Sequence, residues 1–278
     1  MTLVAVLLMA LQGNAQAGAA PGLLQETKEE CKKALDAFRV AFHTGGEAGR
    51  SSAVEALGKH HCPNAIAALA PIAAGDSDKV RIAAAHALGG IDHPKSVEAL
   101  VEALSAAEGA KDVFDAVLKA IQTLDWEPAA ERLNSMLSKY HDKGLIDEVQ
   151  AVIPVLGSLG SPTSVDPLLT LLEHAEQAKP QGRGRTRASG NPKLAALEGP
   201  IKAALASITG GTGGNYKQWK AWWQENRDRL SAQAVLVFWC KLTGKRFEQK
   251  ASDLQSCPYH DKPEKDGVIV KVRLRARA

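Results

Sequence analysis

Aromatic residues are scarce in this chain, and neither sign of charge is in large excess. Only 5% of its 278 residues are Phe, Trp or Tyr, although 45% are hydrophobic. A core of this composition is made mainly of small and medium aliphatic side chains, as in stacked helices. The 34 basic and 31 acidic residues leave a net charge of +3. This near balance argues against a protein that binds nucleic acid through its overall charge.

Charged residues are also absent from the first 25 positions. The apolar run TLVAVLLMAL, residues 2–11, is too short to span a bilayer. An A-x-A sequence at residues 15–17 follows it, as at the cleavage site of a secretory signal peptide, although no Lys or Arg precedes the run. A buried N-terminal helix is the alternative, but the glycines and proline of residues 13–22 disfavour it. We therefore expect residues 1–17 to be a signal peptide and the mature protein to be periplasmic or secreted.

Residues 78–107 predict two amphipathic helices joined by a short turn. Their apolar positions follow helical spacing and are Ile82, Ala85, Leu88 and Ile91 in the first helix and Val97, Leu100, Val101 and Leu104 in the second. Neither helix can bury its apolar face alone, so the pair requires neighbours on both sides.

Such neighbours recur along the chain. Leu57, Leu88, Leu124 and Leu159 are spaced by 31, 36 and 35 residues. A second apolar helix is expected after each of them, over residues 64–74, 95–106, 127–140 and 163–176. This period predicts an all-α solenoid of stacked antiparallel helix pairs over residues 25–230. Ile208 lies 49 residues beyond Leu159, and the excess corresponds to a Gly-, Pro- and Arg-rich insert at 178–192, which we expect to be a loop.

The segment DKVRIAAAHALGGI, residues 78–91, resembles a HEAT repeat of the short, PBS-lyase-like form. The matching residues are Asp78, Val80, Arg81, Ala84, Ala85, Ala87, Leu88, Gly89 and Ile91. The other repeats are degenerate, and the resemblance extends over roughly residues 25–210. It implies a solenoid that presents a surface to a protein partner. Together with the expected signal peptide, this resemblance predicts an exported, non-enzymatic protein–protein interaction scaffold without catalytic residues or a cofactor.

An enzyme or a metal-binding protein that uses the solenoid groove or a C-terminal metal centre is the alternative. The di-iron hydroxylases among HEAT proteins hold their metals with His-Glu dipeptides, and no such dipeptide occurs in this sequence. The bilin lyases stay open, although nothing in the sequence singles out a pigment site.

Three of the five tryptophans, Trp219, Trp222 and Trp223, share one face of a helix expected over residues 215–230, with Asn215 as its N-cap. They follow the glycine-rich sequence GGTGG. The last repeat of a solenoid exposes an apolar end, which three large rings would cover. We favour this capping role over an exposed aromatic binding site. The pattern I-T-G…W-x-x-W-W-x-x-N resembles a terminal element of planctomycete-type exported HEAT proteins.

Residues 233–278 have a different pattern, typical of a small β module. AVLVFWC (234–240) and GVIVKVRLRAR (267–277) are predicted strands. So short a module is expected to need a stabilising cross-link, either a disulfide or a bound metal, and the candidate residues are Cys240, Cys257 and His260. Their spacing resembles a degenerate zinc ribbon with three ligands where structural zinc takes four. We prefer a Cys240–Cys257 disulfide, with zinc binding or free thiols as the alternatives.

The remaining cysteines, Cys31 and Cys62, are expected to form a disulfide between the N-terminal helix and the first repeat. A metal cluster of His60, His61 and Cys62 is the less favoured alternative, because adjacent residues point in different directions on a helix. A candidate basic surface for an acidic partner, anionic lipid or nucleic acid consists of Arg183, Arg185 and Arg187 in the insert and Arg273 and Arg275 in the last strand. A solvated loop and a charged, solubilising strand face are the alternative that we favour.

Overall fold

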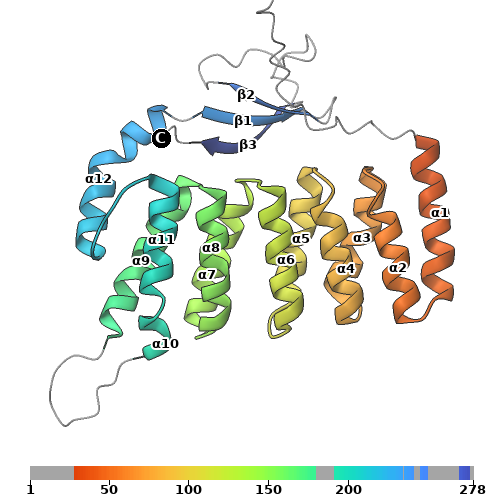
Figure 1. Ribbon diagram of the computed structural model, residues 1–278, viewed down its shortest axis with the longest axis horizontal. Coiled ribbons are helices and arrows are strands. Elements are labelled where there is room, and N and C mark those ends of the chain that lie inside the picture. Colours follow the sequence, from red (N-terminus) through yellow and green to blue (C-terminus); the bar gives the residue numbers. More distant parts are fainter. Residues whose placement is uncertain (1–27, 180–190, 234, 241–244, 250–268, 276–278) are drawn as a thin grey trace, which may run out of the picture.

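The computed structural model describes residues 28–179, 191–233, 235–240, 245–249 and 269–275 of the chain. These residues form a long helical array followed by a small sheet (Figure 1). The helices are α1 (Lys28–Thr44), α2 (Glu47–Leu57), α3 (Pro63–Gly75), α4 (Asp78–Gly89), α5 (Pro94–Ala106), α6 (Lys111–Leu124), α7 (Ala129–Asp142), α8 (Ile146–Leu159), the 3-10 helix η1 (Pro162–Ser164), α9 (Val165–Gln177), α10 (Pro192–Ala195), α11 (Glu198–Thr209) and α12 (Tyr216–Gln233).

The array consists of two layers of helices. One layer, which we call the first layer, contains α2, α4, α6, α8 and α11, each packed on the next. The second layer contains α1, α3, α5, α7, α9 and α12. The predicted α-solenoid is confirmed, and the four expected second helices are α3, α5, α7 and α9. The recurring leucines Leu57, Leu88, Leu124 and Leu159 are all buried in the core between the layers.

Glycine and alanine set the spacing of neighbouring helices in the first layer. A Cβ atom added to Gly58, at the end of α2, would lie 2.5 Å from the Cβ of Ala87 in α4. A Cβ on Gly89 of α4 would similarly lie 2.9 Å from the Cβ of Ala120 in α6. These separations are too short for two methyl groups, so any larger side chain would push the helices apart. Helix α4 therefore contacts the end of α2 through Ala87 and contacts α6 through Gly89.

Arg81 fastens the ends of two helices in the second layer. It is a buried arginine of α4, whose Nη2 donates to the carbonyl oxygen of Ala106 at 2.9 Å and whose Nε donates to that of Ala73 at 3.3 Å. These carbonyls lie in the last turns of α5 and α3, where no intrahelical donor is available. Asp78 accepts from Arg81 Nη1 at 3.5 Å. Arg81 thus caps α3 and α5, and Asp78 accepts a hydrogen bond from its guanidinium.

The step from α6 to α8 departs from this regularity. Leu57 and Leu88 are followed by glycine, whereas Leu124 is followed by Asp125. Asp125 ends α6 in the left-handed conformation, with φ of 52° and ψ of 50°. In this layer, α6 and α8 also pack less extensively than α2 with α4 or α4 with α6. The array is therefore interrupted near its middle.

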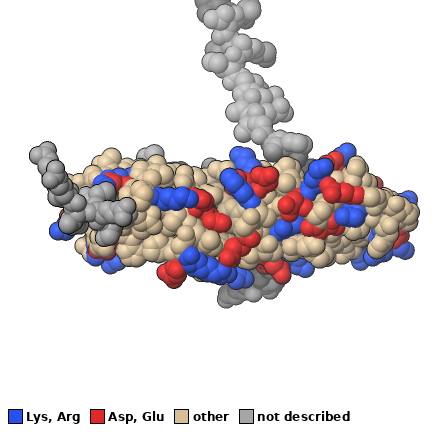
Figure 2. Space-filling model, turned by 90° about the horizontal axis from the view of Figure 1, so that it is seen from below, with Lys and Arg blue, Asp and Glu red and all other residues tan. Residues whose placement is uncertain are grey.

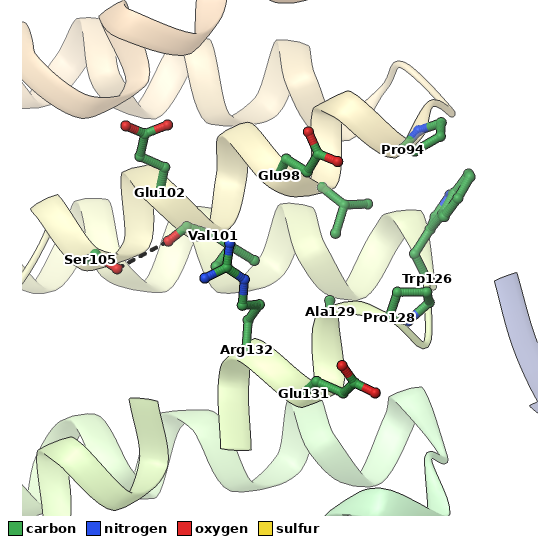
Figure 3. A pocket seen from close by; sticks show the side chains of 11 residues that line it. Pro94, Glu98, Val101, Glu102, Ser105, Trp126, Pro128, Ala129, Glu131 and Arg132 are labelled. Carbon is green, nitrogen blue, oxygen red and sulfur yellow. Dashed lines mark hydrogen bonds between the residues drawn. The ribbon is translucent and has the colours of Figure 1, made fainter. Parts of the chain in front are cut away.

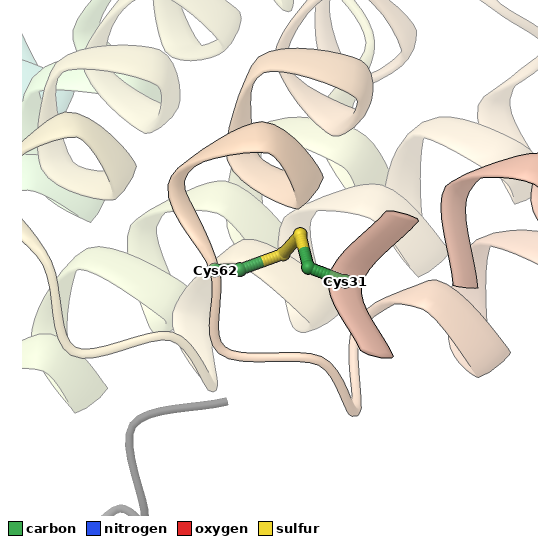
Figure 4. Close-up of a disulfide and its surroundings, with 2 residues drawn as sticks. All are labelled: Cys31 and Cys62. Atoms are coloured by element: carbon green, nitrogen blue, oxygen red, sulfur yellow. A yellow bond between two sulfur atoms is a disulfide. The ribbon is translucent and has the colours of Figure 1, made fainter. Parts of the chain in front are cut away.

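A disulfide joins the first two helices of the second layer. Cys31 of α1 and Cys62, the residue before α3, are both buried, with an S–S distance of 2.01 Å (Figure 4). The bond closes a segment with a sequence separation of 31 residues. Cross-linking a loop of this size stabilises the folded state by about 3–4 kcal/mol, because it restricts the unfolded chain. The pairing expected from the sequence is present, and it holds the N-terminal helix on the array.

The glycine-rich loop before α12 packs against tryptophan rings. Trp219 and Trp223 are 2% and 8% exposed, and Trp222 is partly buried. A Cβ on Gly211 would lie 2.6 Å from the ring of Trp222, and a Cβ on Gly213 would lie 2.7 Å from the ring of Trp219. Glycine is required at both positions because the loop backbone lies directly against the indoles.

Helix α12 begins with reciprocal side-chain caps. The Oδ1 of Asn215 accepts from the backbone N–H of Gln218 at 3.0 Å, as expected for an N-cap. The Oε1 of Gln218 in turn accepts from the backbone N–H of Gly214 at 2.8 Å. The helix is also tied to α9, because Trp223 Nε1 donates to Asp166 Oδ1 at 3.1 Å.

The C-terminal strands form an antiparallel sheet in the order β2-β1-β3. Its strands are β1 (Val235–Cys240), β2 (Arg246–Gln249) and β3 (Ile269–Arg275). The sheet lies across one edge of the helical array (Figure 1). β1 and β3 fall within the predicted strands. β2 was not predicted, because RFEQ is too short and too polar to stand out as a strand.

We predict that Gly58→Ala destabilises the protein by about 1–3 kcal/mol, because its methyl group would overlap Ala87. The matched control is Gly49→Ala in α2, where an added Cβ meets nothing within 4 Å. This control should stabilise the protein by about 0.5–1 kcal/mol, because alanine favours the helix more than glycine does. Denaturant melts of both variants measure the difference. Equal effects would show that the glycine contact does not set the helix spacing.

Candidate interaction groove

A groove of about 680 Å³ lies between α5 and α7, the two second-layer helices on either side of the interruption (Figure 3). Its lining residues come from the full length of α5 and from the start of α7: Pro94, Val97, Glu98, Val101, Glu102, Ser105, Trp126, Pro128, Ala129, Glu131 and Arg132. Helices α5 and α7 pack less extensively than α3 and α5. The groove therefore lies between two helices that leave part of their facing surfaces uncovered.

The floor of the groove is apolar and its rim is charged. Val97 and Val101 of α5 and Ala129 of α7 form the floor. Glu98 and Glu102 are exposed along α5, one turn apart, and therefore lie on the same side of the helix. Glu131 and Arg132 are exposed at the start of α7. In Figure 3 Arg132 extends from α7 into the space between the helices.

The three carboxylates of the rim have no partner in the described part of the chain. Neither Glu98 nor Glu102 nor Glu131 has a side-chain hydrogen bond or an ion pair there. The edge of the array that faces away from the sheet is different, because Figure 2 shows acidic and basic side chains intermixed there. Ion pairs at this end of the helices are Lys79–Glu47 at 3.6 Å, Lys143–Glu108 at 2.6 Å and Lys193–Asp147 at 3.0 Å. The groove rim, by contrast, presents carboxylates that are available to a binding partner.

Trp126 forms the end of the groove nearest the sheet. It is 1% exposed, and its Nε1 donates to Asp92 Oδ1 at 2.7 Å. Its ring lies 5.9 Å from the ring of Trp239 in β1, and the guanidinium carbon of Arg246 in β2 lies 5.3 Å from its centroid. The same side chain thus belongs to the groove and to the contact with the sheet.

Arg246 fastens the sheet to the helical array. Its Nε donates to Asp92 Oδ2 at 2.9 Å and its Nη2 to Asp92 Oδ1 at 2.5 Å, a bidentate ion pair. Nη2 also donates to the carbonyl oxygen of Leu124 at 2.6 Å, and Nη1 to that of Asp125 at 3.5 Å. These carbonyls are at the end of α6, so Arg246 caps this helix from the sheet. We call Asp92, Trp126 and Arg246 the clamp.

His93 lies beside the clamp and caps α5. Its Nδ1 accepts from the backbone N–H of Lys95 at 3.1 Å, and its ring contacts that of Trp239 edge to face at 5.1 Å. Burial lowers the pKa of His93 below its ordinary value of 6.5; Lys95 adds to this effect and Asp92 opposes it. A neutral imidazole is needed here, because a protonated Nδ1 could not accept the capping hydrogen bond.

Most residues singled out in the C-terminal part of the sequence lie outside the described residues. This holds for Cys257, His260, Arg183, Arg185 and Arg187. The Cys240–Cys257 disulfide, the zinc site and the basic surface of the insert therefore stay predictions. Among the described residues, no three His, Cys, Asp or Glu side chains are grouped as metal ligands.

Three other residues of the β module can be placed. Cys240 is buried at the end of β1. Arg273 and Arg275 belong to β3, opposite Val237 and Val235 of β1.

The clamp and the groove were not predicted from the sequence. Asp92 follows a repeat motif in an ordinary polar turn, and Arg246 belongs to a strand without a clear pattern. Trp126 is the one residue whose sequence context indicates the site. A large aromatic follows Leu124-Asp125, whereas a glycine directly follows Leu57 and Leu88. A break in the repeat of this kind indicates a site of special packing.

The helical array has the architecture of a HEAT-type repeat protein. A family model for HEAT repeats matches residues 35–122 and 66–146. The matched region extends from α1 to the first residue of α8 and contains the whole groove. No curated protein matches the chain. In the described residues no helix is both long and apolar enough to cross a membrane.

We predict that Asp92→Ala releases the sheet from the array. The substitution leaves the Arg246 guanidinium and the Trp126 N–H without their shared acceptor, which costs about 1–3 kcal/mol. Hydrogen exchange of β1, residues 235–240, should become faster. The control is Asp228→Ala. The side chain of Asp228 is 97% exposed, so its removal should leave the hydrogen exchange of β1 unchanged. Unchanged protection of β1 in Asp92→Ala would contradict the clamp.

The lowered pKa of His93 predicts that acid weakens the fold. The unfolded chain binds a proton at His93 below about pH 6.5, whereas the folded chain resists it until a lower pH. The contribution of His93 to the free energy of unfolding is therefore full above pH 6.5 and is lost as the pH falls towards the folded pKa. His93→Asn keeps an N-cap acceptor that does not titrate. Melts between pH 7.5 and 5 should show a smaller loss in this variant, and identical losses would refute the role of His93.

Proposed function

We propose that the protein is an exported, non-enzymatic scaffold that binds a protein partner in the groove between α5 and α7. The observation that carries this proposal is the combination of an apolar floor with rim carboxylates that have no partner among the described residues. Charged side chains that have no partner within the fold, beside an apolar strip, are what a protein-binding surface presents. HEAT repeats commonly mediate such interactions, and the groove lies inside the matched repeats.

Two further features support a rigid binding site. The groove is built from helices, and its end wall, Trp126, is held by the clamp to Asp92 and the sheet. A preorganised site loses less conformational entropy on binding than a mobile one does.

Export is supported by the apolar N-terminal run and the A-x-A sequence at residues 15–17, and by the disulfide of Cys31 and Cys62.

The proposal can be tested with a photo-crosslinking amino acid in the groove. We would place it at Ser105 or Arg132, exposed lining residues of the groove, and, as controls, at the exposed positions Glu55 and Glu225 outside the groove. The groove positions should give one defined adduct in the exported fraction of the native host, and the controls should not. An excess of the wild-type protein, which lacks the crosslinking amino acid, should reduce the yield of the adduct. An excess of a Val101→Trp variant, whose groove is filled by the indole, should not reduce it.

Two results would overturn the proposal. One is the absence of a competed adduct at Ser105 and Arg132, and the other is equal labelling at all four positions. N-terminal sequencing of the same exported protein tests the export part separately. A mature chain that begins near Gly18 is expected, and an intact Met1 would contradict the signal peptide.

A further inference from the structure

The charges on the two sides of the groove are unequal. On α5, Glu98 and Glu102 lie one turn apart and are the only charged side chains that this helix contributes to the lining. On α7, Glu131 is followed directly by Arg132, so that side carries no net charge. The excess of negative charge is therefore confined to the α5 side, where a partner would meet two unpaired carboxylates in succession.

The overall charge of the protein does not produce this preference. The chain has a net charge of +3, so a basic partner gains nothing from its general field. Attraction to a cation must come from the local carboxylates, which the structure leaves without internal partners in its described part. Charge complementarity of this local kind sets the choice and the orientation of a partner.

The lining residues follow the axis of α5. Pro94, Val97, Val101 and Ser105 recur at three- and four-residue intervals, so the groove extends for about 17 Å along one side of the helix. A partner helix laid beside α5 would place apolar side chains at the same spacing over Val97 and Val101. A continuous apolar strip with a charged edge is matched by an amphipathic helix.

We propose that the groove binds an amphipathic helix of the partner protein, with Lys or Arg residues on the edge that faces Glu98 and Glu102. The apolar face of this helix lies on Val97, Val101 and Ala129, and its end abuts Trp126. The inference rests on the proposed function, because it specifies the chemistry of the partner at the same groove.

The test uses a labelled 14-residue peptide of leucine and lysine, with the leucines at helical spacing, and the full-length protein. A peptide with glutamate in place of lysine is the counterpart. Fluorescence anisotropy at about 0.15 M salt should show binding of the lysine peptide only, and higher salt should weaken it. Glu98→Gln/Glu102→Gln should weaken binding at least fivefold. The control, Glu55→Gln/Glu225→Gln, changes the net charge equally at exposed sites outside the groove and should leave binding unchanged.

Three results would overturn the inference: no binding of the lysine peptide, tighter binding of the glutamate peptide, or equal weakening by the two double variants. Glutamine keeps the shape of glutamate, so circular dichroism melts of both variants should match the wild type. If the lysine peptide fails while the photo-crosslinked adduct persists at Ser105, the partner has another chemistry and the scaffold function stands. If that adduct is also absent, the proposed function itself fails.

Discussion

The close approach of neighbouring first-layer helices determines the rest of this structure. Gly58 meets Ala87 and Gly89 meets Ala120 at distances that leave no room for a further methyl group. The spacing of the first layer also sets the positions of the second-layer helices, because a short turn joins each of them to a first-layer helix. Arg81 then ties the ends of α3 and α5 to α4. A low-aromatic, alanine-rich sequence suits such packing, because small side chains allow helices to approach.

The groove and the sheet contact both arise where this spacing is relaxed. After Leu124 the chain has Asp125 and Trp126 in place of a glycine turn, and α7 packs less extensively on α5 than α3 does. Trp126 is covered by Trp239 and is hydrogen-bonded to Asp92, which also receives Arg246 from the sheet. The C-terminal sheet therefore completes the array at the step where the repeats alone leave it open. The groove and its end wall are two consequences of one irregularity.

Periodicity made the helical array predictable, whereas the groove depends on contacts that no local pattern reveals. The spacing of Leu57, Leu88, Leu124 and Leu159 indicated the paired helices because burial of one helical face imposes that period. The pairing of Cys31 with Cys62 also followed, since one cysteine lay in the first helix and the other just before the next repeat. The contact of Arg246 with Asp92 spans a separation of 154 residues and joins a short strand to a turn. Such a contact depends on where the sheet lies in three dimensions, which neither sequence segment specifies.

A crystal structure of the protein in complex with its protein partner would test the central claim most directly. The account predicts a helix of the partner between α5 and α7, with apolar side chains over Val97 and Val101 and basic side chains within ion-pair distance of Glu98 and Glu102. A partner bound to the first layer, on α2, α4 and α6, with the groove empty, would contradict it.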